Sequence, residues 1–228
     1  MSVDTKLIKT PYKKENFNQQ QVEDIVKCTQ DPQYFIENFV WIQHPVKGRL
    51  KFNLFDFQRG LLDAYHNHKY SIALISRQMG KSTAAGAYLL WYAMYVPDQT
   101  ILIAAHKYSG AQEIMQRIRF AYELLPDHVR AGVTAYNKGS LEFDNGSRII
   151  AQATTENTGR GLSISLAYLD EFAFVRPSIA REFWTSLSPT LSTGGKCIIT
   201  STPNQDDDQF AQIWRQACNT IDEFGNEK

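Results

Sequence analysis

Short, uniformly apolar runs alternate along this chain with longer stretches in which apolar residues recur at helical spacing. Runs of strand type occupy residues 70–76, 100–105, 163–169 and 196–200. The helical pattern covers residues 21–40, 55–66, 81–95, 109–125, 177–187 and 209–218. A strand that is apolar at every position must be covered on both faces. The alternation therefore predicts an α/β fold, with a mainly parallel central sheet between two layers of helices.

Turn-forming residues divide this pattern at defined points. Pro32 should break the first helical stretch in two, because the residue before a proline avoids the helical conformation. Residues 44–48 contain a His-Pro and a Lys-Gly pair and predict a loop or hairpin. The sequence Asp-Asn-Gly at 144–146 predicts a hairpin between strands at 139–143 and 147–153. We expect one domain over residues 21–220, with a polar lead-in at 1–20 and a polar tail at 221–228.

Composition argues against several classes of protein. The 228 residues include 24 Lys or Arg and 24 Asp or Glu, which argues against binding nucleic acid by bulk charge but leaves room for a local basic face. The longest apolar run, 84–96, is shorter than the roughly 20 residues that span a bilayer. Cys28, Cys197 and Cys218 are scattered and predict neither a disulfide framework nor a zinc site. The N-terminus lacks the apolar core of a secretory signal, so we expect a soluble intracellular protein without membrane contact.

The segment IALISRQMGKST, at residues 72–83, has the form of a phosphate-binding loop. An apolar strand leads into a tight turn, then Gly-Lys-Ser and a helix, so backbone N–H groups would cradle a phosphate. Lys81 would neutralise the β- and γ-phosphates, Ser82 would place its hydroxyl on Mg²⁺, and Gly80 would allow close approach of the backbone. Ile75 stands where the usual pattern begins with Gly or Ala, and a surface turn is the alternative interpretation. The residues expected to contact the nucleotide are Ser76, Arg77, Gln78, Met79, Gly80, Lys81, Ser82 and Thr83.

The apolar strand at 163–169 is followed directly by Asp170 and Glu171. A nucleotide hydrolase needs one carboxylate to hold Mg²⁺ and another to orient the attacking water. We assign the first role to Asp170 and the second to Glu171, at the carboxyl end of a strand, where ligands bind in open α/β sheets. Two solvated charges at a strand end are the alternative. Together with the phosphate loop, the acidic pair predicts the three-layer sandwich of a P-loop NTPase.

Four further features admit both a functional and a structural interpretation. Thr200, Ser201 and Thr202 end another apolar strand and would sense the γ-phosphate, although the pattern alone favours a plain turn. The Gln58 amide has the donor and acceptor that adenine needs, although an exposed helix residue is the simpler interpretation. Arg77, inside the phosphate loop, and Arg160, on a Gly-flanked loop, would each serve either as an arginine finger or as a structural ion-pair partner.

These motifs together resemble the ATPase domain of tailed-bacteriophage terminase large subunits, of the T-even myovirus type. The resembling segments are SRQMGKST, AHKYSGAQEIMQRIRFAYELLPD, NKGSLEFDNGS, LAYLDEFAF and TSTPN, in one colinear order within residues 52–214. The loop SRQ-x-GK-[ST]-T, which lacks the first Gly, is typical of that family. The resemblance implies a DNA-packaging motor, in which several subunits on the portal of an empty procapsid hydrolyse ATP and drive double-stranded DNA inside.

The resemblance also implies roles for individual residues. Gln58 resembles the glutamine that recognises adenine, and Arg77 resembles an arginine finger that acts in cis. Lys81 with Ser82 resembles the phosphate and Mg²⁺ contacts, while Asp170 resembles the acid beside Mg²⁺ and Glu171 the catalytic carboxylate. Arg160 lies in the region where some relatives are thought to supply an arginine in trans. The motif that couples hydrolysis to movement is resembled by Thr200, Ser201 and Thr202.

The partners implied by the resemblance are double-stranded DNA, the portal protein and a small terminase subunit. The active form would be a homo-oligomeric ring docked at the procapsid portal, in the host cytoplasm and not in the mature virion. Positive charge for contact with DNA would come from Lys107, Arg117, Arg119, Arg130 and Lys138. A solvated face of mixed charge is the alternative interpretation of these side chains.

Full-length members of the resembling family continue into a nuclease domain, whereas this sequence ends soon after the resembling region. We therefore expect no nuclease activity, and expect an expression fragment, a partial reading frame or a split-gene member. Asp206, Asp207 and Asp208 are expected to form a solvated acidic turn and not a metal site. Two alternative functions are a helicase-like or other DNA-translocating P-loop ATPase, and a nucleotide-gated assembly module with little turnover in isolation.

Overall fold

The computed structural model describes residues 7–192 and 194–218, and within them seven strands form one mixed sheet. The five parallel strands, in spatial order, are β3 (Tyr70–Leu74), β9 (Lys196–Ser201), β8 (Leu166–Asp170), β4 (Thr100–Ala105) and β7 (Arg148–Ala153). The antiparallel strands β6 (Ser140–Phe143) and β5 (Val133–Tyr136) extend the sheet beyond β7. The predicted α/β fold with a mainly parallel sheet is confirmed.

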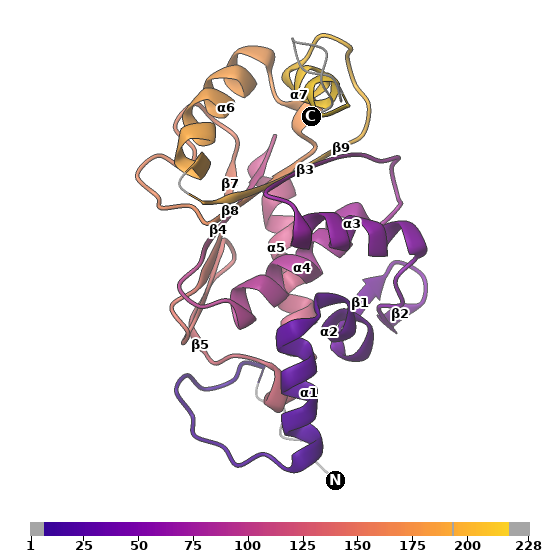
Figure 1. Cartoon of the computed structure of the whole chain (residues 1–228), viewed down its shortest axis with the longest axis vertical. Helices are drawn as coiled ribbons and strands as arrows, with labels where there is room; N and C mark the ends of the chain where they lie inside the picture. Colours follow the sequence, from indigo (N-terminus) through magenta and orange to yellow (C-terminus); the bar gives the residue numbers. More distant parts are fainter. Residues whose placement is uncertain (1–6, 193, 219–228) are drawn as a thin grey trace.

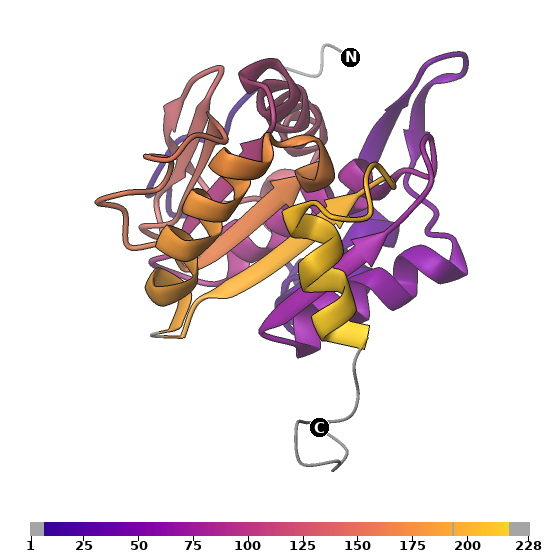
Figure 2. The same ribbon diagram turned by 90° about the horizontal axis from the view of Figure 1, so that it is seen from above.

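Helices cover both faces of this sheet (Figure 1). One face is covered by α3 (Asp56–Asn67), α4 (Lys81–Tyr95) and α5 (Tyr108–Glu123), whereas α1 (Gln19–Gln30) and α2 (Pro32–Phe39) pack outside this layer, α2 against α3 and α4 and α1 against α2. The opposite face is covered by α6 (Pro177–Ser192) and α7 (Gln209–Cys218), with the sheet passing beneath them in Figure 2. Short 3₁₀ turns lie at Asp127–Val129 and Phe172–Phe174. The sheet is thus the middle of three layers.

The alternation of side chains along the central strands explains why their sequences are apolar throughout. In β4, Ile101 and Ile103 face the core beneath α4 and α5, whereas Leu102 packs into the second core beneath α6. In β8, Tyr168 joins the first core and Leu169 the second. Because successive strand residues point to opposite faces, both faces of the sheet are buried and no polar alternation appears in the sequence.

Most predicted elements are found, with differences at their ends. The first helical stretch divides at Asp31, whose side chain caps α2, and strands β1 (Trp41–His44) and β2 (Gly48–Lys51) form the expected hairpin. The hairpin between β6 and β7 is confirmed. Helix α6 runs about one turn past the predicted end, through Pro189, because Thr190 hydrogen-bonds back to the Ser186 carbonyl and Leu191 is fully buried. The pattern does not predict β5.

The polar lead-in is attached to the body of the domain where the structure describes it. The Lys9 carbonyl accepts a hydrogen bond from the Val133 N–H at 3.0 Å, and the Tyr12 N–H donates to Asp144 Oδ2 at 2.9 Å. Residues 1–6 of the predicted lead-in and the predicted tail at 221–228 lie outside the described residues. None of the described helices combines the length and apolar content needed to cross a membrane.

Candidate functional site

Three strands end side by side at one edge of the sheet, and the loops that leave them carry the residues singled out above. Strand β9 lies between β3 and β8, with Leu74 opposite Ser201 and Thr200 opposite Asp170. The carboxyl ends of parallel strands are where open α/β sheets bind their ligands. The topology therefore brings the phosphate loop, the acidic pair and the Thr-Ser-Thr segment to one place.

The phosphate loop turns sharply between β3 and α4. Its first residue is fixed to the sheet, because the Ile75 N–H donates to the Ser201 carbonyl at 3.0 Å. Gln78 and Gly80 adopt left-handed backbone conformations, with φ of 63° and 72°, and helix α4 begins at Lys81. No described side chain caps the start of α4. The first N–H groups of that helix are thus available to an anion, and the helix dipole favours one there.

Gln58 lies beneath this loop and is buried, so its interpretation as an exposed helix residue is wrong. Its Nε2 donates to the Met79 carbonyl at 3.2 Å, and its Oε1 accepts from the Phe55 N–H at 3.1 Å. The left-handed backbone favours glycine at Gly80, and a Cβ there would lie 2.7 Å from Gln58 Nε2, so the Gln58 side chain would have to shift. Gln58 therefore joins the start of α3 to the phosphate loop.

Glu171 pairs with the loop lysine across the site. Lys81 Nζ lies 2.5 Å from Glu171 Oε1, and Glu171 Oε2 accepts hydrogen bonds from the Thr202 N–H and hydroxyl, each at 3.0 Å. Burial alone raises the pKa of Glu171, but the hydrogen bonds from Lys81 and Thr202 outweigh it and hold the pKa below its usual 4.5. The carboxylate is thus ionised and held by both of its oxygens. Its backbone is left-handed, with φ of 50°, an uncommon conformation for a residue with a side chain.

Asp170 is buried at the end of β8 and is held through one oxygen. Its Oδ1 accepts hydrogen bonds from Tyr168 at 2.8 Å, and from Ser82 and Thr200 at 3.1 Å each. No hydrogen bond to Oδ2 is formed within residues 7–192 and 194–218. Burial, and then the charge of Asp170, hold the pKa of Tyr168 well above its usual value, so its hydroxyl is protonated and acts as a donor.

The Thr-Ser-Thr segment belongs to the site, and its interpretation as a plain turn is wrong. Thr200, Ser201 and Thr202 are all buried. Thr200 contacts Asp170, while Thr202 contacts Glu171, so one segment touches both acids. The Ser201 hydroxyl accepts from the Ala173 N–H at 3.2 Å and lies 3.4 Å from Glu171 Oε2.

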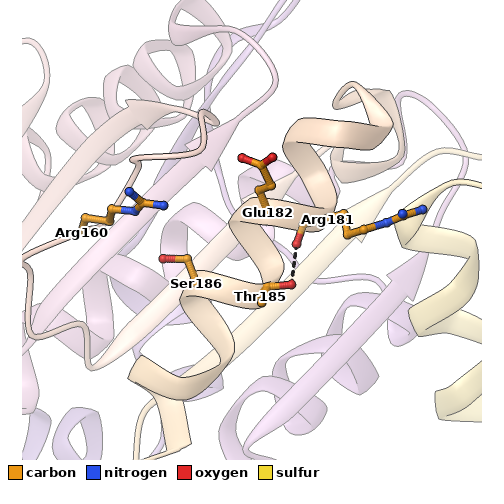
Figure 3. Close-up of a pocket in the computed structure, with 5 residues that line it drawn as sticks. All are labelled: Arg160, Arg181, Glu182, Thr185 and Ser186. Atoms are coloured by element: carbon orange, nitrogen blue, oxygen red, sulfur yellow. Dashed lines mark hydrogen bonds between the residues drawn. The ribbon is translucent and has the colours of Figure 1, made fainter.

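The side chains of the two candidate arginine fingers form no hydrogen bond or ion pair with Asp170 or Glu171 in the described part of the chain. Arg77 is exposed on the phosphate loop, and neither an ion pair nor a side-chain hydrogen bond of Arg77 is found in the described part of the chain. Arg160 borders an open hollow of about 680 Å³ against α6, which Figure 3 shows with Ser186 and Glu182 on the facing side of the helix and Arg181 directed away. Neither Asp170 nor Glu171 lines this hollow.

The remaining loop residues are placed around the rim. Ser76, Gln78 and Met79 are exposed, whereas Thr83 accepts a hydrogen bond from Arg117 at 3.1 Å. Among the described residues, no group of three or more His, Cys, Asp or Glu side chains is arranged to hold a metal ion. The Ser82 hydroxyl lies beside the Asp170 carboxylate, 3.1 Å from Oδ1.

Sequence reasoning missed two polar contacts of this site. Tyr168 lies two residues before Asp170 on the same face of β8, but its run of apolar neighbours makes it look like an ordinary core residue. Asn204 donates to the Ala173 carbonyl at 2.9 Å and so ties the segment after β9 to the turn after Glu171. The spacing of Tyr168 from the acid was the available signal for the first, whereas no signal in the pattern indicates the second.

The acidic run at 206–208 differs from the predicted solvated turn. Asp206 and Asp207 are exposed, but Asp208 is buried. Its Oδ1 accepts from the Ala211 N–H at 2.7 Å, and its Oδ2 accepts from the Gln205 N–H at 3.3 Å. Asp208 therefore caps the start of α7, where a carboxylate satisfies free N–H groups and complements the helix dipole.

The basic side chains considered for DNA contact are largely engaged within the chain. Arg130 is buried and pairs with Asp127 at 2.6 Å. Arg117 pairs with Glu113 at 2.5 Å, and the guanidinium of Arg119 lies over the Tyr136 ring. Lys107 and Lys138 are exposed. Arg130 is thus part of the framework of the domain and is not available as a phosphate contact.

Comparison with known proteins identifies a matching family and similar solved structures. The family described as "Terminase large subunit, T4likevirus-type, N-terminal" matches residues 72–223. The crystal structure of the bacteriophage HK97 large terminase is similar at a TM-score of 0.69 and 22% identity, over 83% of this chain and 41% of that one. The chain thus spans less than half of the HK97 protein.

Two further solved structures share the fold. The large terminase ATPase domain of a Thermus phage is similar at a TM-score of 0.55 and 21% identity, over 78% of this chain and 74% of that one. The large terminase of a thermophilic bacteriophage, solved in complex with ADP, is similar at a TM-score of 0.57 and 12% identity, over 72% of this chain and 42% of that one. The same phage protein has been solved with ATP-γ-S. At these identities the likeness shows the fold, which is that of terminase ATPase domains.

Proposed function

The chain belongs to the T4-like-virus family of terminase large subunits, to whose N-terminal part it corresponds, and from this premise we propose that it is the ATP-hydrolysing motor domain for packaging viral DNA. The observation that carries the proposal is the convergence of Lys81, Asp170 and Glu171 at the carboxyl edge of the sheet. The ADP and ATP-γ-S complexes of a structurally similar large terminase support nucleotide binding by this fold.

The phosphates are proposed to bind at the start of α4. The uncapped N–H groups and the positive end of the helix dipole attract an anion, and Lys81 supplies a full positive charge. Lys81 is engaged by Glu171 at 2.5 Å, so a bound triphosphate competes with Glu171 for the ammonium group. Phosphate binding therefore exchanges one anionic partner of Lys81 for another.

A magnesium ion fits the oxygen donors that remain. Asp170 has an oxygen without a hydrogen bond from the described residues, and the Ser82 hydroxyl lies 3.1 Å from its other oxygen. Hard oxygen donors, few in number and supplemented by phosphate oxygens and water, are what Mg²⁺ takes in phosphoryl-transfer sites. Ser82 and Asp170 would hold the ion, which when bound supplies neutralisation of charge on the phosphate oxygens.

Glu171 is proposed to orient the attacking water. It is ionised, and the donors around its oxygens, from Lys81, Ser201 and Thr202, fix its position. When Lys81 turns to phosphate, Oε1 of Glu171 becomes free to accept a hydrogen bond from water, while Thr202 continues to hold Oε2. Thr202 belongs to the segment proposed to couple hydrolysis to movement. Because Thr202 hydrogen-bonds to Glu171, a displacement of the carboxylate would act directly on that segment.

Other assignments rest on position. Arg77, exposed on the phosphate loop, is proposed as the arginine finger in cis, and Arg160 as an arginine offered to a neighbouring subunit. Gln58 holds the loop through Met79, and its proposed recognition of adenine would require the amide to exchange its contacts with Met79 and Phe55. Double-stranded DNA, the portal protein and a small terminase subunit are the proposed partners of a ring of such chains.

The motor proposal is tested by ATP hydrolysis with and without double-stranded DNA. A packaging motor should turn over ATP, and double-stranded DNA should change the rate in a salt-dependent manner, because phosphate contacts weaken as salt rises. Glu171→Gln should abolish turnover in both conditions. A rate of ATP hydrolysis that does not change with DNA, together with no binding of DNA at low salt, would contradict the motor proposal and favour a nucleotide-gated assembly module.

A further inference from the structure

Three hydroxyl groups converge on a single oxygen of Asp170. Tyr168 donates at 2.8 Å, and Ser82 and Thr200 each donate at 3.1 Å, all to Oδ1. The Tyr168 and Thr200 hydroxyls also lie 3.0 Å from each other. Ser82 and Thr200 belong to the phosphate loop and the Thr-Ser-Thr segment, whereas Tyr168 lies within β8 and has no role assigned to it above.

Packing in the core does not explain why residue 168 carries a hydroxyl group. The side chain is fully buried in the core between the sheet and α4, among residues that are apolar at almost every position. A phenylalanine would fill the same space without bringing a polar atom out of water, which is costly unless it is hydrogen-bonded. The hydroxyl instead reaches the one buried carboxylate within its range.

A second buried tyrosine nearby provides the contrast. Tyr65, on α3, is also fully buried, but its hydroxyl has no hydrogen-bond partner in the described residues. The two side chains are similar in chemistry and burial, and they differ in whether the hydroxyl contacts Asp170. Tyr65 is therefore a matched control for the removal of one buried phenolic oxygen.

We propose that Tyr168 is a positioning residue for Asp170, which holds Oδ1 from beneath and so leaves Oδ2 as the oxygen presented to the cation of a bound nucleotide. The proposal rests on the proposed function, since it concerns how the acid of that same site is oriented. Without the Tyr168 hydroxyl, Oδ1 keeps only the hydrogen bonds from Ser82 and Thr200, and the carboxylate is fixed less firmly in its orientation. A ligand that must be reoriented on binding loses affinity for its ion.

The test is Mg²⁺-dependent binding of ATP-γ-S by the full chain, for the wild type, Tyr168→Phe and Tyr65→Phe. Tyr168→Phe should weaken the apparent Mg²⁺ affinity about tenfold, the scale of lost partners behind a metal ligand. It should leave the affinity for ATP-γ-S in EDTA unchanged. A general disturbance of the site would weaken binding in EDTA as well. Tyr65→Phe should match the wild type in both conditions. Equal Mg²⁺ affinity in all three proteins would overturn the proposal.

A second variant keeps the proposal testable if Tyr168→Phe does not fold, as judged by circular dichroism and thermal melting. Thr200→Val removes from Oδ1, in a similar volume, the hydroxyl that also contacts Tyr168, and should weaken the apparent Mg²⁺ affinity. Unchanged Mg²⁺ affinity in Thr200→Val would overturn the proposal in that case. If wild-type binding of ATP-γ-S does not respond to Mg²⁺ at all, the proposed function itself fails and the role of Tyr168 fails with it.

Discussion

The ammonium nitrogen of Lys81 lies 2.5 Å from Oε1 of Glu171, so the side chain suited to bind phosphate is paired with the side chain suited to activate water. The pair is partly shielded from solvent, with side-chain exposures of 9% for Lys81 and 24% for Glu171. In the proposed function, a bound triphosphate would release Glu171 as it takes Lys81. Binding of the phosphate would then make the carboxylate available to water.

The Glu171 carboxylate should make stability depend on pH in a defined direction. Its pKa lies below 4.5 in the folded chain, so it stabilises the fold above its unfolded pKa, and this contribution is lost as the pH falls through the folded value. Glu171→Gln should melt at a lower temperature than the wild type at about pH 7. The difference should shrink as the pH falls below the unfolded pKa of 4.5. Thermal melting across this range checks it, and a difference in Tm that is independent of pH would contradict the assigned pKa shift.

Gly80→Ala should destabilise the chain more than Gly48→Ala. Both glycines have a left-handed backbone, with φ of 72° and 70°, so each substitution incurs the strain of an L residue there, about 1–2 kcal/mol. Only at Gly80 does the new Cβ also approach another atom, Gln58 Nε2, at 2.7 Å. Urea unfolding of the two variants gives the comparison. Equal losses would show that Gln58 yields without cost, and Gly80→Ala alone should also weaken nucleotide binding.

Asp208→Ala should cost about 1 kcal/mol of unfolding free energy, because it removes the buried cap of α7. Asp206→Ala and Asp207→Ala are matched controls in the same acidic run, since both side chains are exposed and should change stability by less than about 0.5 kcal/mol. Denaturant titrations of the three variants check this. Three equal values would mean that the carboxylate of Asp208 does not stabilise the helix start.

The fold could be predicted from the sequence because its strands and helices have distinct periods. Helix α4, strand β4 and helix α7 begin and end where the pattern places them, since each is bounded by a change of period or a turn residue. Strand β5 has four residues and a register irregularity against β6, so it depends on pairing that a local pattern does not reveal.

The sequence indicates those candidate site residues that end a strand or begin a helix, and does not indicate those that depend on contacts between distant segments. Asp170 and Glu171 follow a strand, and their partners Lys81 and Ser82 begin a helix, so topology brings them together. The pattern alone could not show that Gln58 is buried or that Thr202 reaches Glu171, because both depend on packing between distant segments. Tyr168 looked apolar because only its last atom is polar.

The most direct test of the nucleotide site and its catalytic carboxylate is steady-state ATP hydrolysis by the wild type, Lys81→Ala, Glu171→Gln and the exposed control Lys138→Ala. We predict turnover in the wild type and in Lys138→Ala, with losses on the order of a thousandfold in Lys81→Ala and Glu171→Gln. We also predict that Glu171→Gln still binds ATP-γ-S and Mg²⁺, since Lys81 is then free for phosphate. Turnover in Glu171→Gln equal to that of the wild type would contradict the assignment of the catalytic carboxylate, and failure of the folded wild type to bind ATP would contradict the nucleotide site itself.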